Sequence, residues 1–195
     1  MVPPVFVLET ADRVLTHAMS ALSTLLRSGR PLHLIILDAS AAMTLEADAA
    51  GLAAAHPDLG YLAVAHRDAL VLQTSLALPG HLYDGLGTVA ASLRPSVAVV
   101  AVPEWSGPVA PWAQLTAAHH GRATPGFLYD PDAGVTWARR FDLQPNPQVD
   151  EPWPRLAVQV QDTSGAVIET QDIFTFAHAA AMAPRCRHAF RVIPT

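Results

Sequence analysis

Polar side chains that could bind a ligand or take part in catalysis recur where short apolar runs end. Seven residues occupy these positions: Glu9, Thr10, Asp38, Ser40, Thr74, Ser75 and Glu104. The runs resemble buried parallel strands, and an open parallel sheet binds its ligands beyond the carboxyl ends of its strands. The seven residues are therefore the candidate lining of a ligand crevice, without assigned catalytic roles. Capping of the helices that follow the strands is the simpler interpretation of the same residues.

The patterns of common cofactor and nucleophile sites are missing around these residues. Residues 8–12 contain no Gly, which argues against a loop that cradles the phosphates of NAD, FAD or a P-loop nucleotide. Ser40 and Ser75 lack the flanking glycines of a nucleophile elbow. The sequence therefore gives a hydrolase or a nucleotide-dependent enzyme no positive support.

A metal site is not expected either. The nine histidines include no pair at the spacing that places both on one helix face, and adjacent His119 and His120 would point about 100° apart on a helix. The single cysteine, Cys186, excludes an internal disulfide or an iron–sulfur cluster held by this chain alone. We interpret Cys186 as an incidental thiol.

Composition limits the class of protein. The chain has 195 residues, of which 51% are hydrophobic and 15% charged, so it can fill a substantial core. A net charge of −5 argues against nucleic acid as the main partner. No apolar run is long enough for a membrane span, and no signal-peptide pattern is seen, so we expect a cytoplasmic protein. All 12 basic residues are Arg, which excludes Schiff-base chemistry on a lysine.

The order of apolar runs and helical patterns predicts the fold. We expect strands at residues 5–8, 32–37, 61–65, 69–74 and 96–102, and helices at residues 12–26, 44–55 and 79–93. Continuous apolar strands separated by helices are typical of a doubly wound, mainly parallel sheet with helices on both faces. We expect this α/β sandwich to form one domain over residues 1–121.

Residues 122–195 are expected to form a C-terminal extension packed on that domain. Four prolines between residues 144 and 154 predict a stiff connector. Two alternating segments on either side of a turn at residues 162–165 predict a β-hairpin, and residues 175–182 predict a short helix.

Several stretches resemble a known family. Residues 30–38 (RPLHLIILD), 71–77 (VLQTSLA) and 94–100 (RPSVAVV) look like strands of the thiamine-diphosphate domain of pyruvate:ferredoxin (2-oxoacid) oxidoreductases. The pieces Tyr129-Asp130-Pro131, WARRF at residues 137–141, Asn146-Pro147 and Pro152-Trp153-Pro154 are similar to the segment after that domain in related large oxidoreductases. The resemblance spans most of the chain and implies the same α/β fold.

The chain departs from that family where the cofactor is held. Family members bind the diphosphate through Mg²⁺, with a Gly-Asp-Gly turn after the first strand and an Asn after the second. Here the first position reads Glu9-Thr10-Ala11, and residues 40–44 read SAAMT without an Asn. The resemblance therefore implies a degenerate relative without a cofactor. Thiamine diphosphate with Mg²⁺ is expected only if other residues replace the motif.

Three functions remain open. The leading hypothesis is a cofactor-free structural or docking domain of an oxidoreductase-like protein, in contact with a second copy or with other subunits. The second is a small enzyme or anion-binding domain that uses Glu9, Asp38 and Ser40. The third is a homo-oligomerisation module, for example a dimer. A docking surface should expose a contiguous apolar patch, whereas an enzyme should show a deep pocket with converging polar groups.

Overall fold

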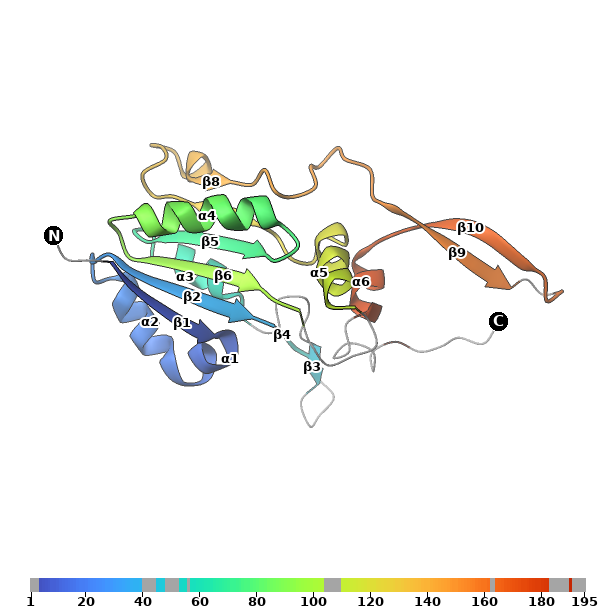
Figure 1. The fold of residues 1–195 in the computed structure, drawn as a ribbon, viewed down its shortest axis with the longest axis horizontal. Coiled ribbons are helices and arrows are strands. Elements are labelled where there is room, and N and C mark those ends of the chain that lie inside the picture. Colours follow the sequence, from blue (N-terminus) through green and yellow to red (C-terminus); the bar gives the residue numbers. More distant parts are fainter. Residues whose placement is uncertain are drawn as a thin grey trace.

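The computed structural model describes residues 4–39, 45–47, 53–55, 57–103, 110–161, 164–182 and 190. Ser40, Glu104 and Cys186 lie outside the described residues. Within them the predicted α/β class is confirmed, because a six-stranded, mostly parallel sheet carries helices on both faces (Figure 1).

The sheet has the order β1-β2-β6-β5-β7-β8. Its parallel strands are β1 (Val5–Thr10), β2 (Leu32–Asp38), β6 (Ser96–Ala101) and β5 (Leu70–Ser75). Two short strands, β7 (Phe127–Tyr129) and β8 (Phe141–Asp142), extend it in antiparallel fashion. The sheet therefore takes its last two strands from the C-terminal extension.

One face of the sheet is covered by the first helical segment and by α3. This segment consists of α1 (Ala11–Arg13), the π-helical turn η1 (Val14–Ala18) and α2 (Met19–Leu26), and α3 spans Leu59–Val64. Leu26 and Leu59 pack there in one core cluster with Ile36 and Val99 of the sheet. Burial of these apolar side chains is the main force that holds the layers together.

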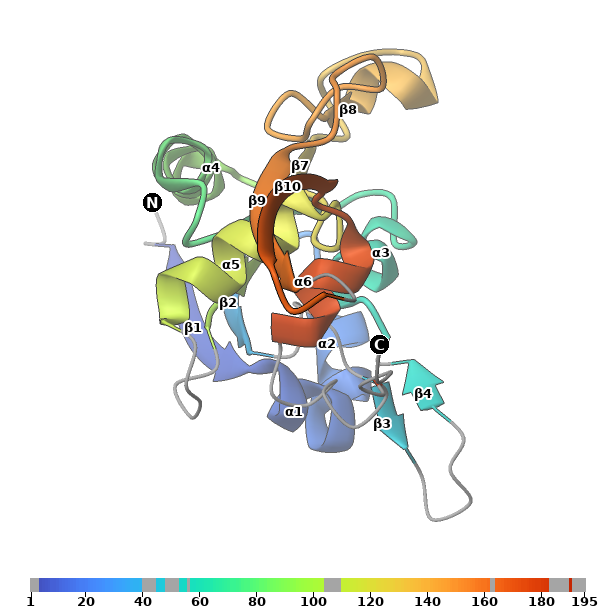
Figure 2. The ribbon, with the colours of Figure 1, turned by 90° about the vertical axis from the view of Figure 1, so that its right-hand side faces the viewer.

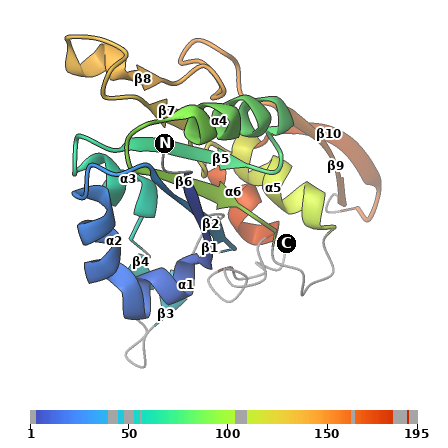
Figure 3. The ribbon, with the colours of Figure 1, turned by 60° about the vertical axis from the view of Figure 1, so that its left-hand side comes forward.

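The opposite face carries α4 (Pro79–Ala91). Val89 of α4 packs on Leu72 of β5 and Ala98 of β6, all of them fully buried. Figures 1 and 3 show α4 on one side of the sheet and α1 and α2 on the other. The main contacts of α4 with the sheet are to β5 and β6, so this helix sits over the middle of the sheet.

Two local expectations were wrong. The strand expected at residues 61–65 is the helix α3, whose first turn is capped by Asp58, with the Tyr61 N–H donating to its side chain over 3.0 Å. An apolar run this short does not distinguish strand from helix, and the cap decides. The helix expected over residues 44–55 is not formed by its described parts, which pair as β3 (Leu45–Ala47) and β4 (Ala53–Ala55). Helix propensity is a weak preference that such pairing overrides.

The rest of the C-terminal extension has the predicted hairpin and helix. Strands β9 (Arg155–Gln161) and β10 (Val167–Ile173) are antiparallel, and α6 (Phe176–Met182) follows. Figure 2 shows α6 beside α5 (Pro111–His120), against which it packs. The hairpin extends away from the sheet (Figure 1).

Candidate functional site

The carboxyl ends of β1 and β2 enclose a small hollow. Thr10 and Asp38 both line it, and its volume is about 230 Å³. They meet because β1 and β2 are neighbours in register, with Thr10 paired with Leu37. The other lining residues are Ala11, Asp12, Leu37, Ala39 and Val102. Of the expected crevice residues, the structure thus brings Thr10 and Asp38 together.

Glu9 is engaged beside this hollow rather than in it. Its carboxylate lies 3.4 Å from Nε of Arg13, one helical turn further along the chain. Arg13 is mostly exposed, so the ion pair contributes little to stability. The ion pair nevertheless engages the carboxylate of Glu9, which the enzyme hypothesis placed in the crevice.

Thr74 and Ser75 lie farther along the same sheet edge. The register aligns Asp38 with Ala101 and Ala101 with Ser75, so β6 separates the two polar residues by two strand spacings, about 10 Å. Ser75 Oγ accepts a hydrogen bond of 3.1 Å from the N–H of Ala77, at the turn that leads into α4. The hydroxyl of Ser75 therefore stabilises a turn, as the capping interpretation predicts.

A half-buried histidine that was not among the candidate residues partners Thr74. Nδ1 of His81 lies 2.9 Å from Oγ1 of Thr74. Burial lowers the pKa of His81, and this effect outweighs the opposing influence of Asp142 and Asp84. His81 is thus held neutral as a hydrogen-bonding partner of the strand end. No sequence motif indicated His81, because its partner Thr74 lies on the preceding strand and only the fold brings the two together.

The described residues at this edge do not fit thiamine diphosphate with Mg²⁺. The helical segment starts directly at Ala11, whose side chain is buried in the core, where the family has its Gly-Asp-Gly turn. The hollow is smaller than the roughly 300 Å³ at which small-molecule sites begin. Within the described part of the chain, no group of three His, Cys, Asp or Glu side chains is placed to hold a metal ion.

A larger hollow, of about 1020 Å³, lies at the opposite end of the sheet. It runs between the C-terminal half of α4 and the turn at residues 130–132. Apolar side chains dominate its lining, among them Leu70, Leu86 and Leu93, and Arg94 and Asp132 line it as well. No local sequence pattern predicts this hollow, because the two segments that form it are far apart in the sequence.

Two charged groups of this hollow, Arg94 and Asp132, bind each other. Arg94 donates two hydrogen bonds to the carboxylate of Asp132, of 2.6 Å from Nε and 2.7 Å from Nη2. Its Nη1 is 3.5 Å from the carbonyl oxygen of Asp68. The hydrogen bonds from Arg94 lower the pKa of Asp132. The guanidinium is thus occupied by the protein's own carboxylate, which disfavours an external anion at this position.

Comparison of the sequence with protein-family models and with curated proteins gave no match. In the described residues, no helix combines the length and apolar character needed to cross a bilayer.

Proposed function

We propose that this chain is a cofactor-free docking domain related to the thiamine-diphosphate domain of 2-oxoacid:ferredoxin oxidoreductases. The observation that carries the proposal is the exposure of β1. Its consecutive apolar side chains Val5, Phe6, Val7 and Leu8 are 48%, 49%, 41% and 62% exposed. Parallel strands are ordinarily covered on both faces. A strand of this composition at the open edge of the sheet favours contact with another protein.

The state of the strand ends supports the cofactor-free part of the proposal. Glu9 pairs with Arg13, and Ser75 holds the turn before α4. The helical segment begins where a phosphate-binding turn would be needed. The fold is retained while its usual binding edge is used for internal contacts, which agrees with a domain kept for its surface.

The small-enzyme hypothesis has less support. It requires several polar groups that converge in a deep pocket. In the described residues the strand-end hollow brings together Thr10 and Asp38 from the expected set, and the larger hollow holds an arginine already paired with Asp132.

Calorimetric titration of the purified chain with thiamine diphosphate and Mg²⁺ tests the proposal. We expect no heat of binding, because the described edge lacks both the space and the ligands. Binding at micromolar strength would overturn the cofactor-free assignment and favour the enzyme hypothesis. The matched variant Asp38→Asn then locates the site, since it removes the charge that would face the cation and keeps the size of the side chain.

A further inference from the structure

We infer that β1 pairs with β1 of a second copy of this chain, antiparallel and around a two-fold axis at Val7. This inference rests on the proposed docking function and names its partner. β1 ends the sheet, with β2 as its neighbour among the described strands. Two copies would then share one continuous sheet.

Among the described strands β1 pairs with β2 on one side, so the backbone groups on its other side have no strand partner there. The N–H of Val5 donates to the carbonyl of Pro31 over 3.4 Å, on the side of β2. Alternate residues of a strand direct their N–H and C=O groups to opposite sides. Val7 therefore also faces β2, whereas Phe6 and Leu8 direct their backbone groups outward. An open edge of this kind is a template for another strand.

A two-fold axis at Val7 uses these groups in the correct pattern. It places Phe6 opposite the partner's Leu8, and Leu8 opposite the partner's Phe6. Both are outward-facing residues, so each such pair exchanges two N–H···O=C hydrogen bonds. Val7 then faces the partner's Val7 as a pair without hydrogen bonds. Every one of these cross-strand pairs is apolar, which stabilises an antiparallel arrangement.

The distribution of charge selects the antiparallel direction. Glu9 is the only charged residue of β1. In the antiparallel arrangement it lies opposite the partner's Val5, and the two Glu9 residues are about 14 Å apart along the strands. In a parallel arrangement in register, the two carboxylates would lie side by side at about 4.8 Å and repel each other.

Pro4 limits the register. It has no N–H to donate, so it is tolerated only at the margin of the pairing. With the axis at Val7, Pro4 falls at the rim, opposite the partner's Thr10. The Pro4–Thr10 pairs then lack one hydrogen bond each at the ends of the ladder, while both Phe6–Leu8 pairs are complete. Moving the axis to Phe6 would set Pro4 opposite the partner's Leu8, and the same loss would fall in the pairs next to the centre. The register with its axis at Val7 is thus the one in which the apolar Phe6–Leu8 pairs keep all their hydrogen bonds.

The sheet face around Phe6 is also open to a partner. Phe6 packs on His33 with ring centroids 4.9 Å apart, and neighbouring residues of β2 on this face, such as Ile35, are half-buried. The main sheet contacts of α4 are to β5 and β6, and Phe6 and Leu8 of β1 stay exposed. Pairing would place the partner's Leu8 beside Phe6 and cover part of this surface.

Cysteine cross-linking tests the register directly. In a Cys186→Ser background, Val7→Cys should form a disulfide between two copies under mild oxidation, because opposed residues of a pair without hydrogen bonds have Cα atoms about 4.5 Å apart, within disulfide range. Val5→Cys is the matched control, since Val5 is similarly exposed and lies on the same strand. The two copies of residue 5 would be about 14 Å apart and should not be linked.

Sedimentation equilibrium from low micromolar to several hundred micromolar chain supplies a second measurement. We expect the wild-type chain to dimerise within this range and Leu8→Lys to shift the midpoint at least tenfold upward, because it sets a cation in the apolar pair. Val149→Lys, at a residue that is 98% exposed and away from β1, should leave the midpoint unchanged.

Two results would overturn the inference: a wild-type chain that sediments as one 20.7 kDa species at every concentration, or a Val5→Cys variant that cross-links as readily as Val7→Cys. Neither depends on thiamine diphosphate. Failure of self-pairing is thus distinguishable from binding of the cofactor, which would overturn the proposed function.

Discussion

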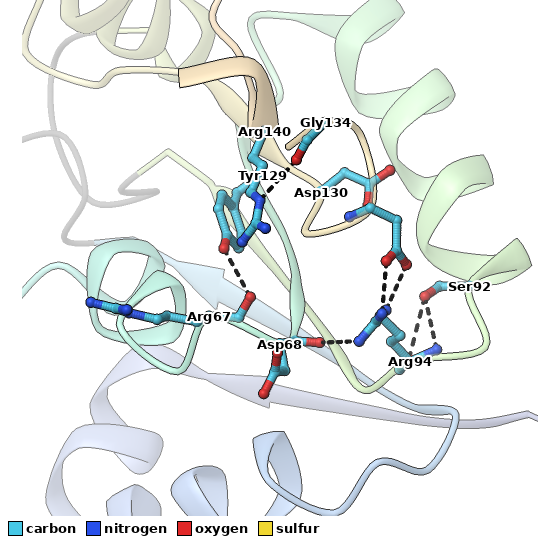
Figure 4. Close-up of polar contacts among 9 residues, drawn as sticks. Arg67, Asp68, Ser92, Arg94, Tyr129, Asp130, Gly134 and Arg140 are labelled. Atoms are coloured by element: carbon cyan, nitrogen blue, oxygen red, sulfur yellow. Dashed lines mark hydrogen bonds and ion pairs between the residues drawn. The ribbon is translucent and has the colours of Figure 1, made fainter. Parts of the chain in front are cut away.

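The hydroxyl of Tyr129 donates a hydrogen bond of 2.8 Å to the backbone carbonyl of Arg67 (Figure 4). Arg67 has a left-handed backbone, with φ of 65°, in the turn between α3 and β5. The ring of Tyr129 is fully buried and contacts Phe141 and Trp137, with centroids 4.9 Å and 5.4 Å away. One side chain of the C-terminal extension therefore fixes a turn of the parallel sheet, and the two parts of the chain share a core.

Tyr129→Phe should lower the free energy of unfolding by about 1 kcal/mol, because it keeps the ring and removes the donor to a partly buried carbonyl. Urea denaturation followed by circular dichroism measures the change. Tyr83→Phe is the control, since Tyr83 is 81% exposed and should change stability little. Equal stability of Tyr129→Phe and the wild type would show that the hydrogen bond contributes nothing.

Gly85 and Gly87 form a matched pair that tests the packing of α4. A Cβ on Gly85 would lie 2.5 Å from Cδ1 of the buried Leu72, whereas a Cβ on Gly87 would have no atom within 4 Å. Gly85→Ala should destabilise the fold by about 1–3 kcal/mol through overpacking. Gly87→Ala should stabilise it by up to about 1 kcal/mol through helix propensity. Thermal unfolding that ranks the two variants in the opposite order would contradict the position of α4.

The sequence predicted the central strands well, since β2, β5 and β6 are buried on both faces and their apolar runs are continuous. It missed α3, because LGYLAV has no polar face and only the cap at Asp58 distinguishes it. The insertion of β7 beside β5 depends on contacts between residues more than 50 positions apart. Such pairings leave no local pattern.

The candidate site was predictable only in part for the same reason. Polar residues at strand ends were found from the sequence, but which of them meet depends on strand order. Thr10 and Asp38 meet because β1 and β2 are neighbours, while β6 separates Asp38 from Ser75. The pairing of Arg94 with Asp132 joins residues 38 positions apart across a turn and could not be inferred from spacing.

Stability should fall on acidification because desolvation lowers the pKa of three histidines. Burial lowers the pKa of His33 below its ordinary value of 6.5, and Nδ1 of His33 lies 2.7 Å from Oγ of Ser96. The unfolded chain therefore takes up a proton as the pH falls through about 6.5, while the folded protein does not until a lower pH. The contribution of His33 to the free energy of unfolding is therefore fully present above pH 6.5 and is lost progressively as the pH falls below it. Burial also lowers the pKa of His81 and His119, so they act in the same direction.

His33→Gln isolates the contribution of His33. It should reduce the slope of stability against pH between about pH 7.5 and 5, since one buried titrating group is lost. Urea unfolding at several pH values measures that slope. His17→Gln is the control, because His17 is exposed in η1. A slope in His33→Gln as steep as in the wild type would mean that other groups account for the acid sensitivity.

The proline-rich connector should open when Trp153 is removed. The guanidinium of Arg122 lies 4.3 Å from the centroid of the Trp153 ring and donates hydrogen bonds to the carbonyls of Gln148 and Glu151, so one arginine holds the connector from two sides. Trp153→Ala should make cleavage of the Val149–Asp150 bond, by a protease that cuts before aspartate, about fivefold faster, which corresponds to about 1 kcal/mol of cation–π stabilisation. Trp112→Ala is the control, since Trp112 is 61% exposed on α5. Equal cleavage rates in both variants would show that the connector is held by its prolines alone, because these restrict the backbone whether or not the ring is present.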